Sequence, residues 1–203
     1  MQLAQLCSLL EKQVPPGSLD YCLQLWKENP FQFTLRHSRV TKLGDFTCRP
    51  GQSPRITVNA DSHPYVFLLT YVHEVAHLRV HSRLGWKAAP HGREWKEAFR
   101  SLCEPLFTLA IFPEEVALAL RRHLKNPKAS SLTDAHLTRV LHQYDEEKKD
   151  ALRLADLPEG SQFQIRGRWF AKGKLRRTRV LCKEIVSRRN YLIAADALVG
   201  SNR

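Results

Sequence analysis

The hydrophobic positions recur with two different periods along the chain. Over roughly the first 145 residues they mostly follow helical spacing, whereas later they alternate as in strands. The helical pattern predicts helices at residues 3–27 (interrupted at 15–17), at 65–84, around 95–102, at 113–123 and around 137–144. Three short alternating segments lie between the first two, at residues 31–35, 45–48 and 55–59, and predict a small antiparallel sheet.

The C-terminal part predicts a separate β structure. Phe163, Ile165 and Trp169 alternate with polar residues, so we expect them to form its core. A hairpin turn is expected at 171–174, followed by strands at 175–185 and 191–199. The chain is therefore predicted to be α+β. It has a mainly helical domain with a small antiparallel sheet at 1–125, a linker and helix at 126–154, and a small basic β domain at 155–203.

Composition narrows the class of protein. The formal charge is +12, which favours polyanionic partners such as nucleic acid. Residues 161–190 carry ten basic side chains and one acidic side chain. The five cysteines are scattered, which argues against a disulfide framework and a cysteine zinc site. No stretch is long and apolar enough for a membrane helix, and the start lacks a secretory signal pattern, so we expect a cytoplasmic protein that binds no membrane.

The segment 65–84 is apolar almost all round, which predicts a buried helix. Asp61 or Ser62 is expected to cap it, with Pro64 in its first turn. In its middle stands His73-Glu74-Val75-Ala76-His77, the H-E-x-x-H pattern. Spacing of four places both imidazoles on one helical face, where they can bind one Zn²⁺. Glu74 is then positioned to act as the catalytic acid/base.

Three residues compete for the place of third ligand. His81 lies one turn further along the same helix, too far along the axis to share one metal with the pair. Glu97 is predicted to face solvent, opposite the apolar face of its helix. His91 stands just before that helix, on the side of its apolar face, after a loop long enough to reverse the chain. We therefore assign the third ligand to His91.

Three segments resemble the SprT/Spartan-like zinc metalloprotease family: 67–77, which contains the motif, Pro90-His91-Gly92-Arg93-Glu94-Trp95, and Lys42-Leu43-Gly44-Asp45-Phe46. The resemblance covers about residues 20–110 and implies a zincin-like fold. It also implies His73, His77 and His91 as zinc ligands and Glu74 as the catalytic acid/base. Eukaryotic members degrade proteins crosslinked to DNA, so the resemblance implies a link to DNA repair. Many members carry a C-terminal zinc ribbon, which this chain lacks because only Cys182 follows Cys103, as in a bacterial SprT-like variant.

The basic tail is the second candidate site. Cations interleaved with aromatic residues on short strands suit a nucleic-acid surface, although a small barrel with solvated arginines would have the same pattern. The predicted nucleic-acid-binding residues are Arg166, Arg168, Lys172, Lys174, Arg176, Arg177 and Arg179. The expected function is zinc-dependent hydrolysis of peptide bonds, in proteins associated with DNA. The alternatives are a nucleic-acid-binding protein with a structural zinc and no proteolytic activity, and a zinc hydrolase acting on a small molecule.

Overall fold

The structure is a computed structural model that describes residues 1–37, 42–128, 134–145 and 151–201. The chain divides into two compact units, residues 1–141 and 142–203. The division falls inside the helix Ala135–Gln143. The sequence predicted instead a separate linker and helix at 126–154, between the two domains. Part of that linker, residues 129–133, lies outside the described residues. The described part is α+β, as predicted, and none of its helices has the length and apolarity to cross a membrane.

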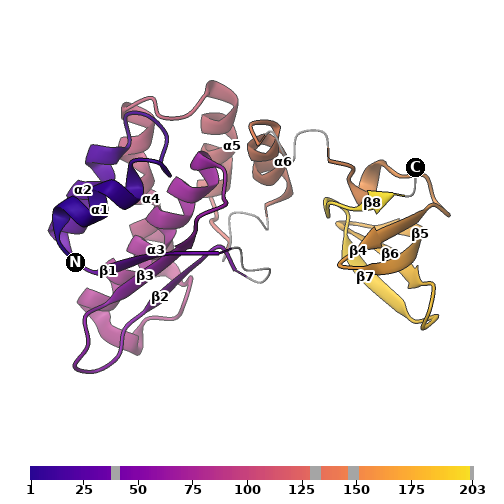
Figure 1. The fold of residues 1–203 in the computed structure, drawn as a ribbon, viewed down its shortest axis with the longest axis horizontal. Helices are drawn as coiled ribbons and strands as arrows, with labels where there is room; N and C mark the ends of the chain where they lie inside the picture. The colour runs from indigo at the N-terminus through magenta and orange to yellow at the C-terminus, as the bar shows by residue number, and fades with distance from the viewer. Residues whose placement is uncertain (38–41, 129–133, 146–150, 202–203) are drawn as a thin grey trace. The chain divides into compact units, whose positions relative to one another are not determined.

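Within its described residues, the first unit contains five complete helices, most of a sixth and three strands, which Figure 1 shows from indigo to light brown. The helices are α1 (Leu3–Leu10), α2 (Leu19–Glu28), α3 (Pro64–Leu84), α4 (Arg93–Thr108), α5 (Glu114–Leu124) and α6 (Ala135–Gln143), with a short 3₁₀ turn at Gly85–Lys87. The strands are β1 (Gln32–Arg36), β2 (Gly44–Thr47) and β3 (Arg55–Asn59).

Helix α3 is the central element of this unit, and it is buried over most of its length. It contacts β2 and β3 on one side and α4 on another, which explains why its sequence is apolar all round. Its N-cap is His63, whose Nδ1 accepts a hydrogen bond from the backbone of Tyr65. The prediction of Asp61 or Ser62 as the cap was therefore wrong, although Pro64 does open the helix.

The sheet has the order β1-β3-β2. The predicted antiparallel sheet was wrong in part, because β1 pairs with β3 in parallel and only β2 pairs with β3 antiparallel. Alternation tells which side chains share a face but says nothing of which strands are neighbours, so the sequence could not show that β3 lies in the middle. Phe33, Ile56 and Val58 are buried on one face of this sheet. On that side, Phe33 packs edge-on against Phe67 of α3, with ring centroids 6.4 Å apart.

The second unit contains a five-stranded antiparallel sheet in the order β7-β6-β5-β4-β8. Its strands are β4 (Gln162–Ile165), β5 (Arg168–Arg176), β6 (Arg179–Glu184), β7 (Asn190–Ala194) and β8 (Gly200–Ser201), with a 3₁₀ turn at Leu154–Asp156. The buried residues are Leu154, Phe163, Phe170, Val180 and Cys182. A basic β unit in this part of the chain agrees with the prediction.

Two details of this sheet differ from the predictions. The first turn lies at Arg166 and Gly167, which both have positive φ, and it pairs Phe163 with Phe170. Paired residues share a face, so Phe170 joins the core and stacks on Phe163, while Trp169 is only half-buried. The prediction of Trp169 as a core residue was wrong because alternation was followed through a turn.

The hairpin turn predicted at 171–174 is also wrong. Strand β5 runs through these residues, and the turn lies at Arg177 and Thr178, between β5 and β6. Gly173 is needed there for another reason. A Cβ at this position would lie 2.5 Å from the carbonyl oxygen of Leu181, next to a register irregularity between Lys172 and Leu175. Glycine inside a strand marks a bulge and a close backbone approach.

Candidate metal centre

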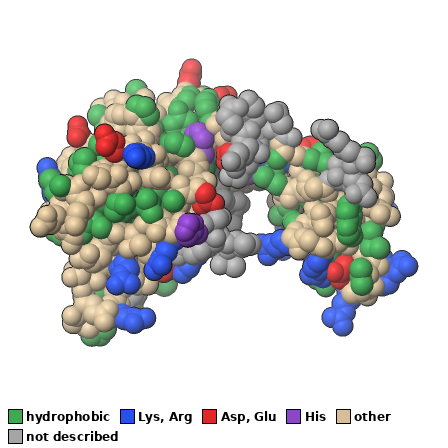
Figure 2. Space-filling view, in the orientation of Figure 1, with side chains coloured by type: hydrophobic (Ala, Val, Ile, Leu, Met, Phe, Trp, Pro, Cys, Tyr) green, Lys and Arg blue, Asp and Glu red, His purple; other side chains and the backbone are tan. Residues whose placement is uncertain are grey.

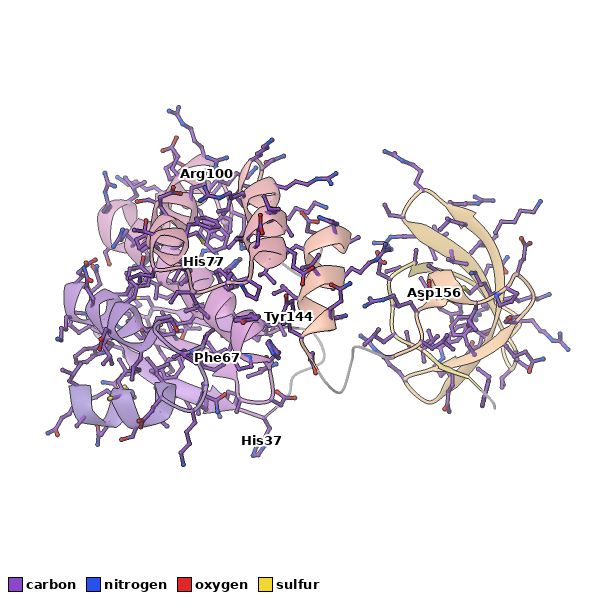
Figure 3. All side chains as sticks on the ribbon, turned by 90° about the horizontal axis from the view of Figure 1, so that it is seen from above. His37, Phe67, His77, Arg100, Tyr144 and Asp156 are labelled. Atoms are coloured by element: carbon purple, nitrogen blue, oxygen red, sulfur yellow. The ribbon has the colours of Figure 1, made fainter. Side chains whose placement is uncertain are left out.

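Three histidine side chains converge at the middle of the first unit. His73 and His77 come from α3, one turn apart, and His91 comes from the loop before α4. Their Nε2 atoms form a nearly equilateral triangle, with sides of 3.2 Å (His73–His77), 3.1 Å (His73–His91) and 3.0 Å (His77–His91). Figure 3 labels His77 among the side chains that fill this part of the unit. Among the described residues, these three form the one group of metal-ligating side chains close enough to hold an ion.

Hydrogen bonds cannot satisfy this triangle. A neutral imidazole has one N–H and one acceptor nitrogen. If one of the three Nε2 atoms carries the proton, the other two direct lone pairs at each other, and if two carry protons, the hydrogens collide. A cation inside the triangle accepts all three lone pairs. Each nitrogen lies about 1.8 Å from the centre of the triangle, slightly less than the Zn–N distance of about 2.0–2.1 Å, so the site is the right size for a metal.

The three imidazoles are also neutral at physiological pH. Burial lowers the pKa of His73 to about 2 and that of His77 to about 4; the charges of His77 and His91 lower the pKa of His73 further, and that of His91 lowers the pKa of His77. Burial lowers the pKa of His91 as well. Neutral imidazole is the form that binds a metal, because its nitrogen lone pair is free of a proton. The site is therefore ready to accept a cation without first losing protons.

His91 reaches the site through an unusual backbone conformation. Its φ is 56°, a left-handed value that only a few per cent of residues other than glycine adopt, although histidine is among those that tolerate it best. The next residue, Gly92, closes the turn by donating its N–H to the carbonyl of Ala89 at 2.9 Å, and a Cβ on Gly92 would lie 2.9 Å from that oxygen. Strained backbone of this kind persists at sites where the surroundings hold a functional side chain in place.

Trp95 packs against all three imidazoles. Its ring centroid lies 4.6 Å from that of His73, 5.4 Å from that of His77 and 4.8 Å from that of His91. The indole is buried and stacks on Phe99 at 5.0 Å. This apolar support restricts the rotamers of the histidines and keeps water from one side of the site. The sequence showed Trp95 only as a residue on the apolar face of its helix.

Glu74 lines the same cleft as the three histidines. The cleft has a volume of about 310 Å³, and strand β2 forms its other wall with Gly44, Asp45 and Phe46. The Glu74 side chain is 7% exposed and lies against the backbone of β2. A Cβ on Gly44 would lie 2.6 Å from Glu74 Oε1 and 2.6 Å from Thr70 Cγ2. Glycine at position 44 is therefore what allows the strand to approach the helix at Glu74.

The two rejected ligand candidates lie outside the cluster. His81 packs against Phe46 of β2, with ring centroids 5.5 Å apart. Glu97 is exposed and forms an ion pair with Arg93, with its Oε1 2.9 Å from the arginine Nε. Neither belongs to the group of side chains that can share one ion. The structure thus brings His91 to the His73–His77 pair and leaves His81 and Glu97 away from it.

The predicted nucleic-acid-binding residues divide into two groups in the second unit. Arg168 and Lys172 bind within the sheet: Arg168 donates to Glu184 at 2.5 Å and to Tyr191 at 2.8 Å, and Lys172 donates to the carbonyls of Ala155 and Leu157. The other five are exposed and have no ion-pair partner among the described residues. They are Arg166 in the first turn and Lys174, Arg176, Arg177 and Arg179 in the β5–β6 hairpin. Figure 2 shows Lys and Arg side chains projecting from this unit.

No family model, curated protein or solved structure matches this chain. The function is therefore argued from the geometry and chemistry of the site.

Proposed function

We propose that this protein is a zinc-dependent metallopeptidase. One observation carries the proposal: three neutral imidazole nitrogens form a metal-sized triangle in a cleft that also contains the carboxylate of Glu74. Three protein ligands leave a coordination position of Zn²⁺ open, as in catalytic sites, whereas structural sites are closed by a fourth ligand. Among the described residues no fourth ligating side chain joins the cluster.

Each side chain has a defined task in this proposal. His73, His77 and His91 would hold the metal, which when bound supplies a Lewis acid that acidifies water and polarises a carbonyl oxygen. Glu74 accepts the proton of the water that attacks the peptide carbonyl, and then donates that proton to the leaving amine. Trp95 holds the imidazoles in place from the apolar side.

The cleft suits an extended peptide. Among the described residues, strand β2 lies at the edge of its sheet, with β3 on one side only, and it forms one wall of the cleft. A free strand edge offers N–H and C=O groups that pair with an added peptide strand. Such pairing would place a peptide bond beside Glu74 while leaving the peptide side chains free, which favours a protein substrate over a small molecule. We propose proteins held at DNA as the natural substrates, since the chain is strongly basic.

A second function is supported by a different observation. The exposed cations of the β5–β6 hairpin suit phosphate contacts, so the protein could be a nucleic-acid-binding protein whose metal is structural. Burial of Glu74 away from any cleft would favour that alternative, but Glu74 lines the cleft of the metal centre. We therefore prefer the peptidase.

Substitution of Glu74 tests the proposal. Glu74→Gln keeps the shape of the side chain but cannot accept a proton, so hydrolysis of a disordered basic protein should fall by about 10²–10⁴-fold. Zinc content and stability should stay close to wild type. Glu97→Gln is the matched control, because it removes the same charge from an exposed glutamate outside the cleft. Each protein is assayed with and without single-stranded DNA. Equal activity in Glu74→Gln and wild type would contradict the peptidase, and a zinc-loaded wild type inert on every protein substrate would favour the structural metal.

A further inference from the structure

A second pocket lies on the other face of the three-stranded sheet. Ile56 and Val58 of β3 point into the core, so the intervening Thr57 lies on the opposite face, together with its cross-strand partner Asp45 of β2. A pocket of about 230 Å³ opens there. Its lining is almost entirely polar, and it consists of Arg36, Asp45, Thr47, Arg49, Gln52, Ser53, Arg55 and Thr57. We call this the arginine pocket.

The described residues that line the arginine pocket carry a net positive charge. Its lining has three guanidinium groups and one carboxylate. The carboxylate, Asp45, already binds Lys42, with Nζ and Oδ1 2.7 Å apart. The side chains of Arg36, Arg49 and Arg55 have no hydrogen bond or ion pair with any residue that the structure describes. Figure 2 shows Lys and Arg side chains gathered over this sheet.

The pocket also contains a buried hydroxyl without a partner. Thr57 is 6% exposed, and its Oγ1 has no hydrogen bond within the described part of the chain. Leaving a buried polar group unpaired costs free energy, and a ligand that supplies a partner recovers it. Rotation about χ1 of threonine moves its hydroxyl among three staggered positions, so Oγ1 can turn toward a bound oxygen atom. Gln52 and Ser53, in the loop between β2 and β3, offer further donors at the rim.

These groups match the chemistry of phosphate. Guanidinium groups form paired hydrogen bonds with the oxygens of phosphate and remain charged at every physiological pH. The three arginines are exposed at the surface, so a polymer can cross the pocket without being enclosed. The chain as a whole carries a formal charge of +12, which draws polyanions to it. We propose that the arginine pocket binds a phosphate group in the backbone of a nucleic-acid strand.

The arginine pocket lies next to the cleft of the metal centre. Asp45 lines both the arginine pocket and the cleft of the metal centre, so the two sites lie on either side of strand β2. A nucleic-acid strand bound in the arginine pocket would lie next to the cleft, within the first unit. This holds whatever the second unit binds. The site is distinct from the exposed cations of the β5–β6 hairpin. Binding at it requires no hydrolysis, so its test is independent of the proposed peptidase activity.

The experiment measures binding of a fluorescein-labelled oligodeoxythymidine of about 20 nucleotides to the full chain by anisotropy, across a range of salt. The triple variant Arg36→Ala, Arg49→Ala, Arg55→Ala should bind at least about tenfold more weakly at low salt. The slope of log K against log salt should fall by about 0.7, which is the contribution of one phosphate contact on a single strand. The matched control is Lys12→Ala, Lys27→Ala, Arg122→Ala, which removes three exposed positive charges from the turn after α1 and from helices α2 and α5. An equal loss in the control would overturn the pocket.

Thr57→Val tests whether the arginine pocket is a specific binding site or only a positively charged surface. Valine has nearly the shape of threonine and leaves all charges in place, so affinity should fall a few-fold without loss of stability. Unchanged affinity in Thr57→Val would overturn the arginine pocket as a binding site. Binding of inorganic phosphate is tested against potassium chloride at equal ionic strength. This comparison shows whether the pocket takes a free phosphate ion or a phosphate in a nucleic-acid backbone. If phosphate binds wild type but not the arginine variant, while oligonucleotide affinity is equal in both, the site takes a free anion and the nucleic-acid assignment is wrong.

Discussion

Gly44→Ala tests whether strand β2 forms the wall of the cleft at the candidate metal centre. The added Cβ would lie 2.6 Å from Thr70 Cγ2, whereas carbon atoms in contact ordinarily lie about 3.5–4.0 Å apart, so the overlap is about 1 Å. Thr70 cannot turn away easily, because it is buried and its hydroxyl donates to the carbonyl of Val66 at 2.8 Å. The same Cβ would lie 2.6 Å from Glu74 Oε1. Either β2 moves away from α3, or Glu74 changes rotamer.

Both responses have measurable costs. Inserting a methyl group into a packed site costs about 1–3 kcal/mol, which for a protein of this size lowers Tm by about 2–4 °C per kcal/mol. We expect Gly44→Ala to lose this much stability in urea unfolding followed by tryptophan fluorescence. Because either response changes the position of Glu74 relative to β2 and leaves the histidines untouched, hydrolysis should fall by about tenfold or more while zinc content is retained.

A second substitution shows whether the overlap is the cause. Thr70→Ser removes the Cγ2 atom and keeps the hydroxyl that bonds to Val66, so Gly44→Ala should cost less stability in the Thr70→Ser background than in wild type. Equal costs in the two backgrounds would show that Thr70 does not touch β2. If Gly44→Ala unfolds at the same urea concentration as wild type and keeps full activity, β2 does not lie against α3 and our account of the cleft is wrong.

Three further predictions concern the metal, pH and the basic hairpin. His91→Ala should lower the zinc content from about one ion per chain to a small fraction, while His81→Ala should leave it unchanged; full retention in His91→Ala, measured by elemental analysis, would contradict the ligand set. The pKa values of His73 (about 2) and His77 (about 4) lie below the ordinary 6.5, so below pH 6.5 the unfolded state binds more protons. Urea unfolding of the metal-free protein should therefore show stability falling by about 1.4 kcal/mol per pH unit for each of the two residues between pH 6.5 and 4, and a flat profile would contradict their burial. Replacing the three hairpin arginines with alanine should weaken oligonucleotide binding similarly for unrelated sequences, and a change in sequence preference would argue against phosphate contacts. These arginines are Arg176, Arg177 and Arg179.

Local sequence was enough to predict one half of the metal site. The spacing of His73 and His77 on a continuous helix places both imidazoles on one face, and that relation depends only on helical geometry. The apolar surroundings of Glu74 in the sequence likewise predicted its burial. The charge of the tail and its alternation predicted a basic β unit, because period and composition are properties of the chain itself.

Three features of the structure could not be predicted from local sequence. Alternation predicted Trp169 in the core, but the turn at Arg166 and Gly167 brings Phe170 to Phe163 instead. The order β1-β3-β2 places β3 in the middle of the sheet. The approach of Gly44 to Glu74 joins a strand to a helix far along the chain. Each depends on pairing between segments that the pattern of either segment alone does not encode.

The sequence by itself determined the chemistry available to this protein: two imidazoles and a carboxylate on one buried helix, and an excess of positive charge. Tertiary structure determined which of these side chains lie together. It brings the Nε2 of His91 within 3.0 Å of that of His77, and it gathers around Thr57 the side chains of Arg36 from β1, Arg49 from the loop between β2 and β3, and Arg55 from β3 itself. Helical spacing acts over four residues and is set by backbone geometry, whereas these meetings depend on how whole elements pack, which no short window of sequence contains.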